Sequence, residues 1–209
     1  TTSSASYVND RQKVEISLFK SLETDETYNK GMNGELADVT FGIFASADIT
    51  AADGSIIPAE GLIEIVAVSE GGSVQFTTDL PFGQYYVKEI STNPAYMLNE
   101  NRYPVDLTYV GFETAKVSII ANDAQPIENN LIRGSVKGLK IDTNGTPLEG
   151  AVFSIFPAGT EDFTIEGALA NSISNENGEF AFENIPYGEY VVYETQSPEG
   201  FVPSGIPYS

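Results

Sequence analysis

Two stretches of this chain repeat one pattern, FGQYYVKE at residues 82–89 and YGEYVVYE at residues 187–194. In each stretch apolar residues alternate with a period of two, as on the buried face of a β-strand. The residue that ends this face is a glutamate in both copies, Glu89 and Glu194. A carboxyl group directed into a core is costly unless it is paired or protonated. The repeat therefore predicts a β-fold with two inward-facing carboxyl groups that carry chemistry.

The composition removes most kinds of chemistry. The chain has no cysteine and no histidine, which excludes disulfides, thiol nucleophiles, the common zinc sites and histidine-dependent triads. We therefore expect no cofactor and no metal site. The segment DTNG, Asp142 to Gly145, lacks the other ligands of a calcium loop and predicts a turn between strands.

The charge and hydropathy restrict the partners. With 30 acidic and 10 basic residues the net charge is -20, which disfavours binding to nucleic acid and to anionic membrane surfaces. No apolar run is long enough to span a bilayer, so no membrane insertion of this segment is expected.

The repeat extends beyond the two glutamate strands. Residues 36–44 (LADVTFGIF) correspond to residues 148–156 (LEGAVFSIF), and both stretches predict strands. The 19 glycines and 11 prolines, with short alternating runs between turn signals, are typical of an all-β sandwich. A weak helical pattern at residues 58–68 is better interpreted as a strand over its later half, 62–68.

We predict two tandem β-sandwich domains. The first spans residues 13–131 and the second residues 132–209, while residues 1–12 form a linker or the closing strand of a preceding repeat. The first domain is decorated, because residues 21–35 stand where the second copy has only a short turn.

Each copy opens with a strand whose apolar face includes a lysine, Lys20 or Lys140. A lysine on an edge strand can simply extend into water and prevent aggregation. Because an inward glutamate occurs in the same repeat, a buried lysine is the stronger interpretation. The apolar residues that share these faces are Val14, Ile16 and Leu18 in the first copy and Ile132 and Val136 in the second.

A carboxamide completes the set at the junction between the copies. Ile127 and Asn129 share one face of the expected last strand of the first domain, which directs Asn129 inward. Such an amide could simply bond to a backbone group. A buried amine, carboxamide and carboxyl are also the reactants for an amide bond between side chains. Burial favours neutral lysine and protonated glutamate, which can polarise the amide oxygen and shuttle protons as ammonia leaves.

The chain resembles the Cna B-type, or SpaA-like, prealbumin-like domains of Gram-positive surface adhesins and pilins. The second copy matches that family's motif Y-x-L-x-E-T-x-A-P-x-G-Y as YVVYETQSPEGF, with departures at Val192, Ser197 and Phe201. The first copy keeps a weaker version, YYVKEISTNPAY. The resemblance implies Greek-key, immunoglobulin-like sandwiches with a spontaneous Lys–Asn isopeptide bond between the first and last strands, assisted by the glutamate.

Carried to this sequence, the resemblance implies a bond between Lys20 and Asn129 assisted by Glu89, with Asn130 as an alternative acceptor. In the second copy Lys140 and Glu194 fit the motif, but the closing strand with its acceptor is missing. We expect the partner of Lys140 either beyond Ser209 or in Asn9 of a neighbouring molecule. Asn9 precedes Lys20 by the same interval as Asn129 precedes Lys140.

The predicted function is a non-enzymatic stalk or backbone segment of an adhesin or pilin. We expect an extracellular, cell-wall-anchored protein whose partners are adjacent repeats. The alternative is an adhesin module that binds a host protein or glycan through the insertions at residues 21–35 and 91–115. Aromatic residues of the second insertion, such as Tyr96, Tyr103 and Tyr109, are the feature that could support it. A carboxylate-pair hydrolase is disfavoured, because neither glutamate is accompanied by a second inward acid.

Overall fold

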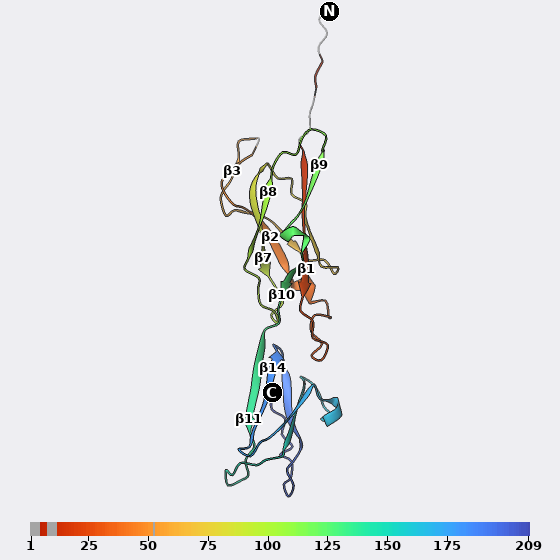
Figure 1. The fold of residues 1–209 in the computed structure, drawn as a ribbon, viewed down its shortest axis with the longest axis vertical. Helices are drawn as coiled ribbons and strands as arrows, with labels where there is room; N and C mark the ends of the chain where they lie inside the picture. Colours follow the sequence, from red (N-terminus) through yellow and green to blue (C-terminus); the bar gives the residue numbers. More distant parts are fainter. Residues whose placement is uncertain (1–4, 8–11, 52) are drawn as a thin grey trace, which may run out of the picture. The chain divides into compact units, whose positions relative to one another are not determined.

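The structure is a computed structural model that describes residues 5–7, 12–51 and 53–209. It is an all-β fold, as predicted, and forms two compact units (Figure 1). The first unit contains the described residues up to Leu22 together with Gly34–Asn93 and Leu98–Asn129. The second contains Glu23–Asn33, Pro94–Met97 and Asn130–Ser209. None of the helices in the described ranges is both long and apolar enough to cross a membrane.

The first unit is a sandwich of two main sheets. One sheet has the order β5-β2-β7-β8, and all of its neighbouring strands are antiparallel. The other is built around β1, which pairs antiparallel with β6 and parallel with β9 and β10. The strands of this unit are β1 (Lys13–Leu22), β2 (Thr40–Ala45), β3 (Ile49–Thr50), β4 (Ile56–Ile57), β5 (Leu62–Ala67), β6 (Ser73–Phe76), β7 (Gly83–Ser91), β8 (Arg102–Leu107), β9 (Lys116–Ile120) and β10 (Ile127–Asn129). Two short 3-10 helices, η1 (Glu35–Asp38) and η2 (Asn122–Ala124), lie between strands.

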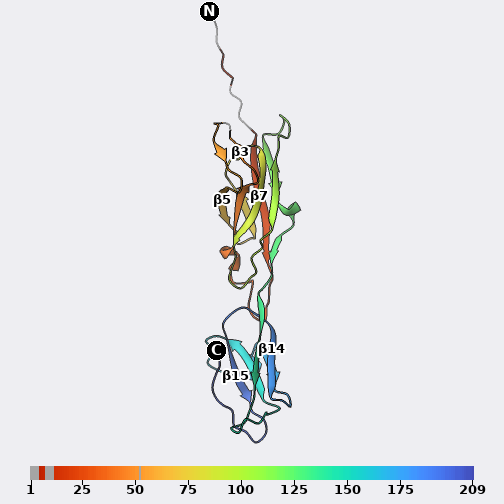
Figure 2. The same cartoon turned by 90° about the vertical axis from the view of Figure 1, so that its left-hand side faces the viewer.

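The second unit repeats part of this arrangement (Figure 2). A three-stranded sheet has the order β13-β12-β15, and a separate pair joins β11 to β14. The strands are β11 (Arg133–Leu139), β12 (Val152–Pro157), β13 (Ala170–Ile173), β14 (Glu179–Pro186) and β15 (Tyr190–Gln196), with a 3-10 helix η3 (Ile165–Gly167). Among the described residues, β14 is the strand that pairs with β11.

The strand registers confirm the sequence repeat. Glu89 of β7 lies opposite Phe41 of β2, and Glu194 of β15 lies opposite Phe153 of β12. A tyrosine corner also recurs, because the hydroxyls of Tyr85 and Tyr190 each donate to a backbone carbonyl four residues upstream, at 2.8 Å in both units. Thus β1, β2, β5, β6 and β7 correspond to β11, β12, β13, β14 and β15.

The outer strands distinguish the two copies. In the first unit, Val87 of β7 pairs with Tyr103 of β8. In the second, the equivalent Val192 pairs with Tyr208 by an isolated bridge with backbone bonds of 2.8 and 2.9 Å. Tyr208 therefore takes the place of the start of β8. No counterpart of β9 or β10 occurs in the described part of the second unit.

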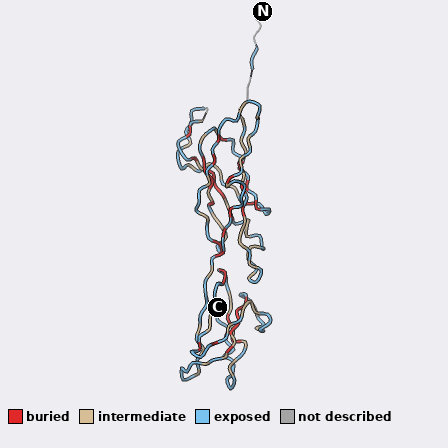
Figure 3. The backbone as a smooth tube through the Cα atoms, in the orientation of Figure 1, coloured by how far each residue is buried: buried red, intermediate tan, exposed pale blue. Residues whose placement is uncertain are grey.

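The first strands of the two copies also differ in which of their residues are buried (Figure 3). In β1 the predicted face is confirmed, because Ile16, Leu18 and Lys20 are buried and Val14 is half-buried. The prediction of a corresponding buried face in the first strand of the second copy is wrong. A bulge between Gly134 and Val136 interrupts the alternation, Ile132 lies outside β11, and Val136 is 36% exposed. Unlike β1, β11 has no neighbouring strand on its second edge among the described residues.

Two strand predictions need corrected boundaries. Residues 36–44 begin within η1, and the strand starts only at Thr40. Residues 148–156 likewise become a strand only from Val152, because Gly150 adopts a left-handed backbone with φ of 86°. The strand interpretation of residues 62–68 is confirmed by β5.

The insertion in the first copy contributes to the second unit. Glu23 and Asp25 form ion pairs with Arg133 at 2.7 and 3.0 Å. A carboxylate oxygen of Glu23 also accepts a 2.8 Å bond from the backbone of Leu131. The ring of Tyr28 packs edge-on against Tyr190, with 5.8 Å between centroids. Much of this insertion therefore serves packing within the chain.

Candidate functional site

Lys20 is directed into the first unit by the alternation of β1. Its side chain is fully buried, and its Nζ donates to the carbonyls of Ser21 and Ile127 at 2.8 and 2.9 Å. Ile127 belongs to β10, which runs parallel to β1 with Lys20 opposite Ile127 and Leu22 opposite Asn129. The lysine is therefore held beside the strand that carries the predicted acceptor.

Glu89 and Asn129 meet this lysine. Glu89 is fully buried on β7, and Asn129 is 2% exposed on β10. The carboxamide nitrogen of Asn129 donates to Glu89 Oε1 at 2.6 Å, and Glu89 Oε2 lies 3.7 Å from Lys20 Nζ. The structure thus brings together the three side chains that the sequence predicted. Asn130, the alternative acceptor, is exposed, because adjacent residues of a strand face opposite sides.

The orientation of the carboxamide differs from the predicted one. We expected Glu89 to bond to the amide oxygen, but it accepts from the amide nitrogen. The second N–H of Asn129 is directed to Thr92 Oγ1 at 2.9 Å. Neither Asn129 Oδ1 nor Glu89 Oε2 has a hydrogen-bond partner among the described residues. The contact with Thr92 was not predicted, because Thr92 follows the end of β7 and no strand periodicity places its side chain.

Burial moves the two titrating groups toward their neutral forms. Desolvation lowers the pKa of Lys20 to about 8, although the neighbouring Glu89 opposes this effect. Desolvation also raises the pKa of Glu89, against the opposing hydrogen bond from Asn129 and the charge of Lys20. Proton transfer from lysine to glutamate gives an uncharged pair in this dry site. The neutral amine that results is a nucleophile.

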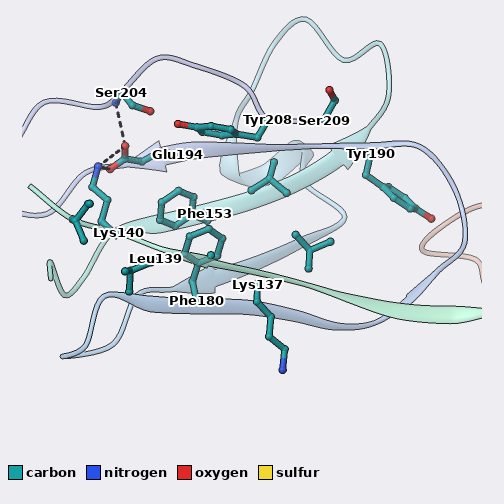
Figure 4. Close-up of a pocket in the computed structure, with 14 residues that line it drawn as sticks. Lys137, Leu139, Lys140, Phe153, Phe180, Tyr190, Glu194, Ser204, Tyr208 and Ser209 are labelled. Carbon is teal, nitrogen blue, oxygen red and sulfur yellow. Dashed lines mark hydrogen bonds and ion pairs between the residues drawn. The ribbon is translucent and has the colours of Figure 1, made fainter. Parts of the chain in front are cut away.

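The second unit brings Lys140 and Glu194 into direct contact (Figure 4). Lys140 Nζ lies 2.8 and 2.9 Å from the two carboxylate oxygens of Glu194, whose side chain is 1% exposed. Glu194 also accepts bonds from the Ser204 amide at 3.1 Å and from the Ser197 hydroxyl at 3.0 Å. Burial by itself would raise the pKa of Glu194, but these bonds together hold it below its ordinary value.

A cavity of about 530 Å³ lies beside this pair. Phe153 and Phe180 line the cavity with their rings stacked, at 3.7 Å between centroids, and Tyr208 is another lining residue (Figure 4). No asparagine or glutamine occurs among the described residues that line it. Each site thus contains its own lysine and glutamate, but only the first has a carboxamide among the described residues. Asn9, the proposed acceptor from a neighbour, lies outside the described residues.

Other kinds of site find no support in the described part of the chain. The described residues contain no cluster of acidic side chains that could hold a metal ion. In the segment at 142–145, Asp142 accepts from the backbone of Asn144 and Thr146, which makes a turn as predicted. Glu89 and Glu194 are the buried acids among the described residues, and each is in a different unit.

The aromatic residues of the second insertion have different surroundings. Tyr96 is buried in the second unit, where its hydroxyl donates to the Glu23 carbonyl at 3.0 Å. Tyr103 is a residue of β8 that packs against the core of the first unit. Tyr109 is 59% exposed, so of these three tyrosines it is the one most accessible to an external ligand.

Comparisons with known proteins agree with this architecture. The structure resembles part of the Bacillus anthracis TIE protein, with a TM-score of 0.64 and 22% identity over 94% of this chain and 31% of that one. It also resembles a C-terminal fragment of the pilus adhesin SpaC from Lactobacillus rhamnosus GG, with a TM-score of 0.52 and 15% identity over 94% of this chain and 81% of that one. At these identities the likeness shows a shared fold. This chain spans less than a third of the TIE protein.

The sequence comparisons identify the family. The comparison with curated proteins found no match. The model of the SpaA prealbumin-like fold domain matches residues 19–122 and again residues 134–209, one match for each copy of the repeat. These two segments include Lys20, Glu89, Lys140 and Glu194, and together they cover most of the chain. The chain therefore belongs to the SpaA prealbumin-like domain family.

Proposed function

We propose that this chain is a structural segment of a Gram-positive surface protein, either a pilin or the stalk of an adhesin, locked by an isopeptide bond. The observation that carries the proposal is the buried contact among Lys20, Glu89 and Asn129. These residues lie on the first strand, a middle strand and the last strand of the first unit. An amine, a carboxyl and a carboxamide gathered in a dry site have little stabilising value as charges, but they are suited to react.

The positions of the three side chains support a reaction in which lysine replaces the nitrogen of the asparagine carboxamide. The neutral Nζ of Lys20 attacks Cγ of Asn129, and the bond between Cγ and Nδ2 breaks. One lysine proton passes through Glu89 to the departing nitrogen, which leaves as ammonia. Glu89 Oε1 already contacts that nitrogen and Oε2 faces the lysine, so one carboxyl group can relay the proton between them.

The bond would give the first unit mechanical resistance. Because β1 and β10 are the first and last strands and run parallel, a bond between them lets tension bypass the strands between. By analogy with disulfide loop closure, a cross-link from residue 20 to residue 129 stabilises the unit by about 4–5 kcal/mol. Such a bond suits a surface protein that contains no cysteine.

Intact mass tests the proposal directly. The protein should be lighter than its sequence by one ammonia, and proteolysis should release a branched peptide joining the segments around Lys20 and Asn129. Lys20→Ala should restore the full mass. Lys137→Ala removes a lysine whose side chain is 67% exposed, and it should keep the deficit. A wild-type mass equal to the unmodified sum would overturn the proposal.

For the second unit, we propose that Lys140 forms the same kind of bond with the asparagine of a strand that lies along β11, assisted by Glu194, and that ammonia leaves as in the first unit. The open edge of β11 and the cavity beside the ion pair can receive a strand by β-addition. That strand comes from beyond Ser209 or from the segment around Asn9 of a neighbouring molecule. For the neighbour, denaturing electrophoresis should show multimers that disappear in Asn9→Ala and Lys140→Ala. A single monomer band would exclude the neighbour as the source.

The second candidate function is ligand binding by the loop after β8. In that loop Tyr109 is 59% exposed and Phe112 is 87% exposed, and Tyr109 packs edge-on against Phe82 at 6.4 Å. Gln12 orders the loop by accepting from the Val110 amide at 3.1 Å. An ordered loop with exposed aromatic residues suits a host protein or glycan. Phe112→Ser should then weaken binding to immobilised host matrix proteins or to a glycan array, while the mass deficit of one ammonia relative to the variant's own sequence is kept.

A further inference from the structure

A hydroxyl residue occurs three positions after the glutamate in both copies of the repeat. It is Thr92 after Glu89 and Ser197 after Glu194. The two residues between differ in each case, Ile-Ser in the first copy and Thr-Gln in the second. The repeat therefore preserves the hydroxyl where it does not preserve its immediate neighbours.

In the first unit this hydroxyl contacts the reacting carboxamide. The Nδ2 group of Asn129 has two N–H donors, one directed to Glu89 at 2.6 Å and the other to Thr92 Oγ1 at 2.9 Å. Because both donors are used, the carboxamide is fixed in one orientation. A carboxamide fixed in this way has its nitrogen between Glu89 and Thr92. The nitrogen is the atom that must leave.

Thr92 also lies on the more open side of the site. Lys20, Glu89 and Asn129 are buried, whereas Thr92 is half-exposed. A departing ammonia molecule bonded to Thr92 Oγ1 is therefore already on the side nearer to solvent. Without that bond it would leave from between buried groups.

The second unit shows the same hydroxyl at a site without a carboxamide. Ser197 is half-exposed like Thr92, and its Oγ donates to Glu194 Oε1 at 3.0 Å. In the second copy the hydroxyl thus bonds to the glutamate itself, and in the first copy it bonds to the carboxamide that contacts the glutamate. Where a carboxamide is present, the hydroxyl accepts from it instead.

We propose that Thr92 is a fourth functional group of the cross-linking site, which orients the Asn129 carboxamide and holds its nitrogen as ammonia leaves. The inference rests on the proposed isopeptide bond. The bonds that form and break are those of the proposed isopeptide reaction. The bond between Lys20 Nζ and Asn129 Cγ forms, the bond between Cγ and Nδ2 breaks, and one lysine proton completes the ammonia. Thr92 accepts a hydrogen bond from the leaving nitrogen throughout and is not itself changed.

The test measures how fast the bond forms after synthesis. The chain is made in a cell-free system, synthesis is stopped, and samples are quenched in acidic denaturant before intact-mass measurement. Thr92→Val removes the hydroxyl but keeps the shape of the side chain, and it should slow the loss of ammonia about tenfold, as expected for one hydrogen bond lost from the transition state. Thr92→Ser keeps the hydroxyl and should restore a rate near that of the wild type.

Ser91→Ala is the matched control. Ser91 is the adjacent hydroxyl residue, but its Oγ contacts Thr40 Oγ1 at 2.7 Å and the Asp38 carbonyl at 3.2 Å, away from the three reacting groups. Its rate should equal that of the wild type. A Thr92→Val rate equal to the wild-type rate would overturn the inference while leaving the isopeptide bond intact.

A second measurement separates chemistry from folding. Thr92→Val combined with Glu89→Ala cannot react and should melt at the same temperature as Glu89→Ala alone. A much lower melting temperature of the double variant would assign Thr92 a structural role and contradict the inference. If the wild-type chain itself never loses ammonia, both the proposed function and this inference fail, which distinguishes that outcome from a failure of Thr92 alone.

Discussion

The two units place a lysine and a glutamate on corresponding strands, yet the pairs are in different states. In the second unit Lys140 bonds directly to both oxygens of Glu194, and the pKa of that carboxyl lies below its ordinary value. In the first unit Asn129 binds Glu89, the lysine is 3.7 Å away, and the pKa of Glu89 is raised. The same two residue types thus form a close ion pair in one unit and, in the other, a wider pair whose glutamate bonds to a carboxamide.

The closing strand accounts for this difference. In the first unit β10 covers β1, excludes water from Lys20 and supplies the carboxamide. In the second unit no described strand covers that edge of β11, and the lysine side chain is 13% exposed beside a cavity. Burial without a close counter-ion favours neutral groups, whereas a direct and partly hydrated contact favours charged ones. The last strand therefore accounts for the different surroundings of the two lysine–glutamate pairs.

The largest expected effect comes from removing Glu89. Glu89→Ala should leave Lys20 and Asn129 unbonded, because Glu89 is the group proposed to relay the proton, and the intact mass should equal the full mass of the variant's sequence, with no ammonia missing. Loss of a cross-link worth about 4–5 kcal/mol should lower the melting temperature of the first unit by roughly 10–25 °C. Differential scanning calorimetry with intact mass measures both effects.

Glu128→Ala is the control for this variant, because Glu128 is an exposed acid on β10 next to Asn129. It should keep both the mass deficit and the melting temperature. A retained mass deficit of one ammonia together with an unchanged melting temperature in Glu89→Ala would show that Glu89 is an ordinary buried acid.

A smaller effect is expected on the stability of each unit as the pH falls. It is measured in Asn129→Ala, because this variant cannot form the isopeptide bond. Glu194 has a lowered pKa, so the stability that it gives the second unit is present above the ordinary glutamate pKa and is lost as pH falls through its folded value. Glu89 has a raised pKa, so its charged form destabilises the first unit at higher pH, and protonation relieves this as pH falls.

The contributions of these two groups should therefore have opposite slopes with pH. Because other carboxyl groups also titrate in acid, each slope is obtained by subtracting the melting curves of Glu194→Gln or Glu89→Gln in the same Asn129→Ala chain. Differences of the same sign in both units would contradict the contrast between the sites.

The smallest effect is expected for the neighbouring asparagine. Asn130→Ala should keep the mass deficit and change the stability of either unit by less than about 0.5 kcal/mol, because the side chain is exposed. Asn129→Ala should abolish the deficit. A loss of the deficit in Asn130→Ala, with its retention in Asn129→Ala, would move the acceptor to the opposite face of the strand.

Much of the first site could be predicted from the sequence. Alternation with a period of two placed Lys20, Glu89 and Asn129 on inward faces, and the structure buries all three. The internal repeat indicated the equivalence of Glu89 with Glu194, which the strand registers confirm. The prediction of a buried apolar face in the first strand of the second copy was wrong. The bulge after Gly134 shifts the alternation of inward and outward side chains, and a bulge leaves little trace in the sequence.

The sequence by itself determined the all-β class, the repeat, and the residue types available for chemistry, because these depend on composition and on local periodicity. Only the tertiary structure decided which way the Asn129 carboxamide faces, that Thr92 holds its second N–H, and that Glu23 and Asp25 bind Arg133. Periodicity fixes the face of a strand on which a side chain lies, but not its torsion angles or its partner from a distant loop. Those are set by packing between segments far apart in the chain, which also decides how closely a lysine and a glutamate approach each other and which third group they meet.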